Sequence, residues 1–207
     1  MAPRSVQALL PFIGSPIHGT FQSLLGTGDL AVVEEAVGLY RQRLGAEGIG
    51  ENTAYPGVAK MLGELKESDK TLFVATAKPL KFAIPILERC GLRGYFTDVY
   101  GSELARQNTQ KGDLIRAILT QHRVSAASAV MVGDRRHDIE GAHTNGVFAV
   151  GVTYGYGSAA ELREAGADLL CDSLGQVSQF LIADVTQPGR AGTSCCIIQR
   201  PCVETHG

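Results

Sequence analysis

Two aspartates stand where a strand is expected to end. Asp134 and Asp138 follow the apolar run 129–132, and the segment 139–142 after them reads as helix. Open α/β sheets bind ligands at the carboxyl ends of their strands. Mg²⁺ prefers carboxylate oxygens and leaves its other positions to water and phosphate. The spacing therefore predicts a magnesium site, although Asp138 as a helix cap and Asp134 as a turn residue would explain it too.

A hydroxyl and an ammonium group follow two other expected strands. Thr76 comes directly after the apolar run 72–75, and Lys111 opens a helix after the expected strand 96–100. A hydroxyl donor, a lysine and a carboxylate pair suit a phosphate group with its metal ion. Alone, Thr76 could cap the next helix and Lys111 could be a solvated lysine. Together they predict that Thr76 and Lys111 converge on one anion, facing the same crevice as Asp134.

Strands and helices alternate from residue 53 to residue 182. This alternation predicts a doubly wound α/β fold with a parallel sheet and right-handed crossovers. Before it, residues 1–52 show helical periodicity, so we expect a small helical unit there, and we expect the polar, Gly-rich stretch 45–52 to be a linker. After it, residues 183–207 break the pattern, and we expect a disordered or loosely attached tail.

The composition indicates a globular protein and gives no sign of binding to nucleic acid or to a membrane. The chain has 207 residues, of which 44% are hydrophobic and 19% charged, with a net charge of −2. This charge gives no reason to expect nucleic acid or an anionic membrane as partner. No apolar run approaches the roughly 20 residues of a membrane span, and the start lacks a signal-peptide pattern. We predict a cytoplasmic protein, and the spacing of its five cysteines does not suggest zinc.

The polar residues at the strand ends resemble three motifs of a known family. The segment 74–79, Lys111 and the segment 133–138 are similar to motifs II, III and IV of haloacid-dehalogenase-like phosphatases, near phosphoglycolate phosphatase and its 5′-nucleotidase-like relatives. The resemblance implies a Rossmann-like core with a helical cap, a small phosphorylated metabolite as substrate, Mg²⁺ as cofactor and an aspartyl-phosphate intermediate. It assigns phosphate binding to Thr76, Ala77, Lys78 and Lys111, charge stabilisation during catalysis to Thr76 and Lys111, and metal binding to Asp134 and Asp138.

One motif of the family has no match. The family's first motif, Asp-x-Asp-Gly-Thr after an N-terminal strand, supplies the nucleophile and the acid–base carboxylate. No Asp-x-Asp occurs in the 207 residues. The family also places that strand at the centre of the sheet, so we expect residues 1–52 to be a partial cap, the core 53–182 to lack its central strand, and phosphatase turnover to be negligible. An alternative is that residues 193–199 insert into the sheet as a substitute for the missing central strand.

Other interpretations of the chain remain. A truncated, non-catalytic form that binds phosphate or a partner is the main alternative. A phosphoacceptor receiver domain also uses aspartates, a threonine and a lysine, but places the acidic pair first. A dinucleotide-binding fold would need a G-x-G-x-x-G after a strand, which is absent. Gly14, Ser15 and His18 could face the site, whereas His18 and His137 also read as surface residues; the exact substrate and the oligomeric state stay open.

Overall fold

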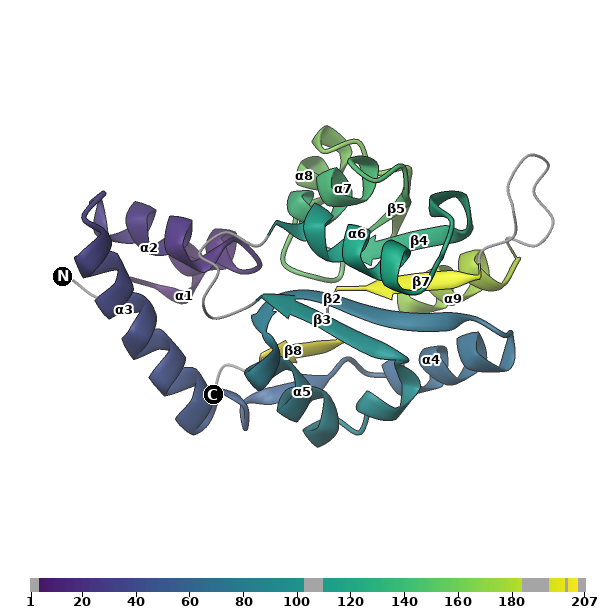
Figure 1. Cartoon of the computed structure of the whole chain (residues 1–207), viewed down its shortest axis with the longest axis horizontal. Coiled ribbons are helices and arrows are strands. Elements are labelled where there is room, and N and C mark those ends of the chain that lie inside the picture. Colours follow the sequence, from purple (N-terminus) through teal and green to yellow (C-terminus); the bar gives the residue numbers. More distant parts are fainter. Residues whose placement is uncertain (1–3, 103–109, 184–193, 200, 205–207) are drawn as a thin grey trace.

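The core is a six-stranded parallel sheet with helices on both faces (Figure 1). A computed structural model describes residues 4–102, 110–183, 194–199 and 201–204. The strand order is β3-β2-β7-β4-β5-β6, and every neighbouring pair is parallel. The predicted α/β fold class with a parallel sheet is therefore confirmed.

The elements follow the predicted alternation closely. The strands of the sheet are β2 (Thr71–Pro79), β3 (Asp98–Ser102), β4 (Ala129–Gly133), β5 (Phe148–Val152), β6 (Leu169–Cys171) and β7 (Cys195–Ile198). The helices around it are α4 (Val58–Glu67), α5 (Leu80–Arg89), α6 (Lys111–Gln121), α7 (Arg136–His143), α8 (Ala159–Glu164) and α9 (Leu174–Ala183), with 3₁₀ turns at Arg93–Tyr95 and Ala126–Ser128.

A helical lobe precedes the core and lies at one end of the molecule (Figure 1). It consists of α1 (Val6–Leu9), a 3₁₀ turn (Leu10–Phe12), α2 (Ile17–Leu25) and α3 (Leu30–Arg43). A π-helical turn (Leu44–Gly48) continues α3, where the sequence suggested only a linker. Asp29 caps α3 by accepting the N–H of Ala31, and Gly26 ends α2 in the left-handed conformation.

The centre of the sheet is filled from the far end of the chain. Strand β7 lies between β2 and β4, with Val74 and Val132 both in register with Ile198. Hydrogen bonds extend the pairing at both ends: Thr71 N–H donates to Ser194 O, and Gln199 N–H donates to Val132 O, at 2.8 and 3.0 Å. The expectation that the central strand is absent is therefore wrong, and the substitute-strand alternative describes the structure.

The expectation of a loosely attached tail is wrong for its described part. Cys195, Cys196, Ile197 and Ile198 are at most 4% exposed. Their side chains alternate between the two faces of the sheet, as in any strand buried on both sides. Farther on, β8 (Cys202–Glu204) pairs antiparallel with β1 (Asn52–Ala54). Strand β7 inserts between β2 and β4 because an empty centre would leave the backbone groups of these two strands unpaired. Residues 184–193 lie outside the described residues.

Two apolar layers hold the sheet between the helices. On one face, α4, α5 and α9 pack against side chains that include Leu72, Val130 and Cys196. On the other face, α6, α7 and α8 pack against side chains that include Phe73, Met131 and Ile197. Burial on both faces explains why the strands are continuous apolar runs. Of the helices that the structure describes, none combines the length and the apolarity that crossing a bilayer requires.

Candidate functional site

The two aspartates after β4 lie together but have different partners. Asp138 is 1% exposed, and its Oδ2 accepts the N–H groups of Asp134 and Arg135 at 3.2 and 3.0 Å. Asp134 is 3% exposed, and its Oδ2 accepts the N–H of Tyr156 at 2.9 Å. Asp134 Oδ1 is buried and has no hydrogen-bond partner among the described residues. Asp134 therefore keeps one free acceptor, whereas Asp138 serves to close the turn.

Lys111 is the buried counter-ion of Asp138. As predicted, it is the first residue of a helix, α6. Its Nζ lies 3.0 Å from Asp138 Oδ1 and donates to the carbonyl of Ala75 at 2.7 Å. Burial raises the pKa of Asp138 and the neighbouring Asp134 adds to this rise, while Lys111 and the Arg135 N–H oppose it. The lysine thus links the loop after β4 to the end of β2.

Thr76 and Lys78 lie on the next strand but one, β2. Thr76 is within the strand, in register with Gly101 of β3, and not at the start of a helix as the sequence suggested, because β2 continues to Pro79. Its Oγ1 accepts the N–H of Lys78 at 3.2 Å. Thr76, Ala77 and Lys78 line the cavity between the helical lobe and the core. They form the opposite side of the crevice from Asp134.

Gln199 occupies the middle of the crevice, and the sequence analysis did not select it. It directly follows β7, is 4% exposed, and its Oε1 has no hydrogen-bond partner among the described residues. Its side chain borders three cavities. One contains Asp134 and Tyr154, one contains Asn52 and Pro201, and the largest extends under the helical lobe. Its position follows from the insertion of β7 as the central strand, because Gln199 is the first residue after β7.

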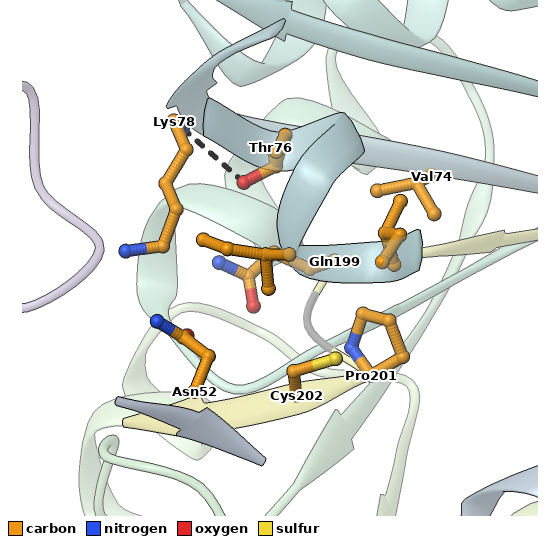
Figure 2. A pocket seen from close by; sticks show the side chains of 10 residues that line it. Asn52, Val74, Thr76, Lys78, Gln199, Pro201 and Cys202 are labelled. Atoms are coloured by element: carbon orange, nitrogen blue, oxygen red, sulfur yellow. Dashed lines mark hydrogen bonds between the residues drawn. The ribbon is translucent and has the colours of Figure 1, made fainter. Parts of the chain in front are cut away.

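Figure 2 shows how the middle cavity is built. The side chains of Thr76, Lys78 and Gln199 face it from the core, and Asn52, Pro201 and Cys202 close the other side. Its volume of about 30 Å³ is enough for one or two water molecules. The crevice therefore presents a hydroxyl, an ammonium group and an amide within one small space.

Two glycines let the backbone approach the aspartates. A Cβ at Gly133 would overlap the Asp138 carboxylate, and a Cβ at Gly155 would overlap that of Asp134. Neither glycine has a positive φ. They are required here because the side-chain space is already occupied, and not for backbone freedom.

Arg135 joins the helical lobe to the core, a role that the sequence analysis also missed. Its guanidinium donates to the carbonyls of Pro11, at 2.8 Å, and Ile13. Its Nε donates to Glu161 Oε1 at 2.9 Å, and the same oxygen accepts the N–H of Arg136. Burial raises the pKa of Glu161, but the hydrogen bonds from Arg136 and Arg135 outweigh it, so the net pKa is lowered. Because Arg135 adjoins Asp134, the lobe is attached directly beside the crevice.

The remaining candidate residues do not all lie at the crevice. Gly14 and Ser15 line the largest cavity of the crevice and so face it. His18 is 9% exposed and its Nε2 lies 3.1 Å from Glu34 Oε1, so the interpretation of His18 as a surface residue is wrong. It is a structural residue between α2 and α3. His137 is partly exposed on α7, 4.0 Å from Glu140.

The described side chains offer few ligands for a metal ion. Within residues 4–102, 110–183, 194–199 and 201–204, no group of three or more His, Cys, Asp or Glu side chains is arranged to hold a metal. Asp134 Oδ1 and Gln199 Oε1 are nevertheless two buried oxygens without donors that border one cavity. Oxygen acceptors of this kind suit a hard cation with several water ligands, and so these residues fit Mg²⁺ as a weakly held ion.

Known proteins are similar to this chain in architecture and in sequence. A 5′-nucleotidase of Pseudomonas aeruginosa is 39% identical over 170 residues, which are 82% of this chain and 76% of that protein. A phosphoglycolate phosphatase of Vibrio parahaemolyticus is 32% identical over 127 residues, 61% of this chain and 56% of that enzyme. The crystal structure of a "predicted phosphatase" from Clostridium acetobutylicum superposes with a TM-score of 0.84 at 33% identity, covering 88% of this chain and 84% of that one. The family model for haloacid dehalogenase-like hydrolases matches residues 2–152. The chain therefore belongs to the haloacid dehalogenase-like hydrolases.

Proposed function

We propose that the crevice at the ends of β2, β7 and β4 binds a phosphate monoester of a small metabolite together with Mg²⁺. In family members that carry the first motif, this is the site of a phosphatase that works through an aspartyl-phosphate. In these 207 residues it is a binding site without turnover. The observation that carries the proposal is Gln199, which follows the central strand between Thr76 on β2 and Asp134 after β4.

Each side chain has a distinct task in this proposal. The Thr76 hydroxyl and the Lys78 ammonium bind the phosphoryl oxygens, with the backbone at Ala77 beside them. Asp134 Oδ1 and Gln199 Oε1 would hold Mg²⁺, which when bound neutralises charge on the phosphoryl group. Lys111 and Asp138 keep the loop in place and contribute a nearly neutral pair. The names of the relatives support phosphoglycolate and nucleotides as the first substrates to test.

We expect no turnover because of the residues at two positions after the central strand. The family resemblance puts the nucleophilic carboxylate directly after the central strand and the acid–base carboxylate two residues later. Gln199 and Pro201 stand at these positions. An amide oxygen carries no charge and cannot be activated by deprotonation, and proline carries no proton to transfer. Catalytic groups that act as a unit are non-additive, so losing the nucleophile alone removes most of the rate, about 10⁶-fold in a well-studied hydrolase.

A phosphate-release assay with Mg²⁺ tests the catalytic part. Phosphoglycolate, nucleoside monophosphates and a generic aryl phosphate should give no release above buffer with the wild-type chain. Gln199→Asp combined with Pro201→Asp should introduce measurable turnover, because two carboxylates then stand just after the carboxyl end of β7. Turnover by the wild type that disappears in Asp134→Asn would overturn this part.

A binding measurement tests the rest. Inorganic phosphate should raise the melting temperature of the wild-type chain in the presence of Mg²⁺. Thr76→Val, which keeps the volume and the β-branch, should reduce that shift, whereas the control Thr144→Val, at the exposed C-terminal end of α7, should not. Equal shifts in both variants would contradict the placement of phosphate at Thr76.

A further inference from the structure

The largest cavity of the crevice extends away from the phosphate-binding residues and under the helical lobe. Thr76, Lys78 and Gln199 form its inner end. Its outer walls come from the lobe, and its volume is about 350 Å³. A group attached to a phosphate at Thr76 would therefore enter this cavity directly. Pockets of about 300–1,000 Å³ typically enclose ligands of drug size.

The walls of this cavity are mainly apolar, and three of them are aromatic. Phe12, Phe21 and Tyr40 line it, and the last two contact each other edge to face with ring centroids 6.0 Å apart. The remaining apolar wall residues are Leu9, Ile13, Ile17, Leu24 and Leu44. Aromatic side chains favour offset or edge-to-face contact with another ring. Glycolate, a two-carbon acid, would leave most of this apolar surface unoccupied.

Two polar side chains lie in the walls of this cavity. Thr20 lines the cavity on α2, is 8% exposed, and its hydroxyl has no hydrogen-bond partner among the described residues. Rotation about its Cα–Cβ bond can turn the hydroxyl toward the cavity, since threonine uses more than one rotamer in helices. Arg41 lines the same cavity from α3. A guanidinium can stack on an aromatic ring or hydrogen-bond to its polar atoms.

From these observations we infer that the site takes a phosphate monoester whose organic part carries an aromatic ring and is of nucleoside size, and that this part contacts Thr20 and Arg41. The inference rests on the proposed function, because it assumes that phosphate binds at Thr76. The cavity volume, the aromatic walls and the unpartnered hydroxyl favour this class over phosphoglycolate. A carboxylate held by Arg41 is the competing occupant.

Calorimetric titration of the full chain with Mg²⁺ distinguishes the two. The probes are inorganic phosphate, phosphoglycolate, 1-naphthyl phosphate and adenosine 5′-monophosphate. At least one of the two aromatic esters should bind ten times more tightly than phosphoglycolate. Leu24→Trp, which fills the cavity, should remove that preference and leave the affinity for inorganic phosphate unchanged. Thr20→Val should weaken the preferred ester about two- to tenfold, the range expected for one net hydrogen bond, and Thr20→Ser should restore it.

The outcomes separate this inference from the proposed function. If inorganic phosphate binds but neither aromatic ester exceeds phosphoglycolate, the preference for an aromatic organic part is refuted and the phosphate site stands. If phosphoglycolate binds most tightly and Arg41→Gln abolishes its advantage, the cavity selects a carboxylate. If no phosphate compound binds, the proposed function itself fails. Melting curves of each variant without ligand show whether a lost affinity reflects a lost fold.

Discussion

At the scale of single residues, the loop after β4 separates two carboxylates by their hydrogen bonds. Asp138 uses both oxygens, one for backbone N–H groups and one for Lys111. Asp134 uses only one, which leaves Oδ1 for a ligand. The same sequence motif thus contains a structural carboxylate, with both oxygens hydrogen-bonded or ion-paired, and a second carboxylate with one oxygen that has no partner among the described residues. The difference lies in which donors surround each group.

The proposal that Asp134 holds Mg²⁺ predicts a metal effect. Mg²⁺ should raise the melting temperature of the wild-type chain at millimolar concentrations, because binding to the folded state alone stabilises it. Asp134→Asn should abolish the shift by removing the one charged ligand. A matched control is Asp172→Asn, an exposed aspartate after β6. The assignment is refuted if Asp134→Asn and the wild type respond equally to Mg²⁺.

The structural carboxylate predicts a stability effect instead. Lys111→Met should destabilise the fold by about 3–5 kcal/mol, because it leaves a charge buried without its partner. The double variant Lys111→Met with Asp138→Asn should recover part of this loss, since the amide carries no charge to compensate. Urea unfolding of the two single variants and the double variant measures the coupling. Additive losses would show that the pair at 3.0 Å does not act as a unit.

At the scale of elements, the sheet depends on a strand from the end of the chain. Ile197 of β7 is 0% exposed and packs among α6, α7 and α8. Burial raises the pKa of Cys195 on the same strand to about 12, so this thiol stays protonated and behaves as a small apolar residue. Strand β7 is therefore part of the core in its side chains as well as in its hydrogen bonds.

Truncating one side chain of β7 tests this placement. Ile197→Ala should cost about 2–5 kcal/mol in the free energy of unfolding, as expected for a buried aliphatic side chain. Leu39→Ala, on an α3 side chain that is 61% exposed, should change it by less than about 0.5 kcal/mol. Chemical denaturation gives both values. If Ile197→Ala proves as mild as Leu39→Ala, β7 does not fill the sheet in solution.

At the scale of the whole molecule, the helical lobe is attached to the core through Arg135 and Glu161. The attachment includes the two carbonyls of the segment that connects α1 to α2. Since the lobe forms the outer wall of the largest cavity of the crevice, its position sets how much of a ligand is enclosed. Figure 1 shows this lobe projecting beyond the sheet at the crevice end.

The lowered pKa of Glu161 gives this attachment a pH dependence. A carboxyl whose pKa is lower in the folded state stabilises it above the unfolded value of about 4.5, and the effect is lost as pH falls through the lower folded value. Acidification below about pH 4.5 should therefore weaken the attachment, seen as faster hydrogen exchange in α2 and α3. Glu161→Gln should show the faster exchange already at neutral pH. An unchanged exchange rate in Glu161→Gln would mean that Arg135 holds the lobe without it.

Local sequence patterns were sufficient to predict the α/β class, the order of most elements and the three motifs that contain Thr76, Lys111 and Asp134. Apolar runs buried on both faces and helices with one apolar face are local patterns, so they can be read along the chain. The aspartates after β4 and Lys111 at the start of α6 followed from the same patterns. The missing carboxylate pair was equally visible, because a motif of adjacent residues is either present or absent.

Long-range packing determines what fills the centre of the sheet and which groups lie together there. Strand β7 pairs with segments more than sixty residues away, and such pairing leaves little local signal in a short apolar run. The positions of Gln199 and Thr20, and the link from Arg135 to the lobe, depend on that long-range packing. The different hydrogen bonding of Asp134 and Asp138 also depends on the tertiary structure, since donors from distant elements determine which carboxylate oxygen has no partner among the described residues.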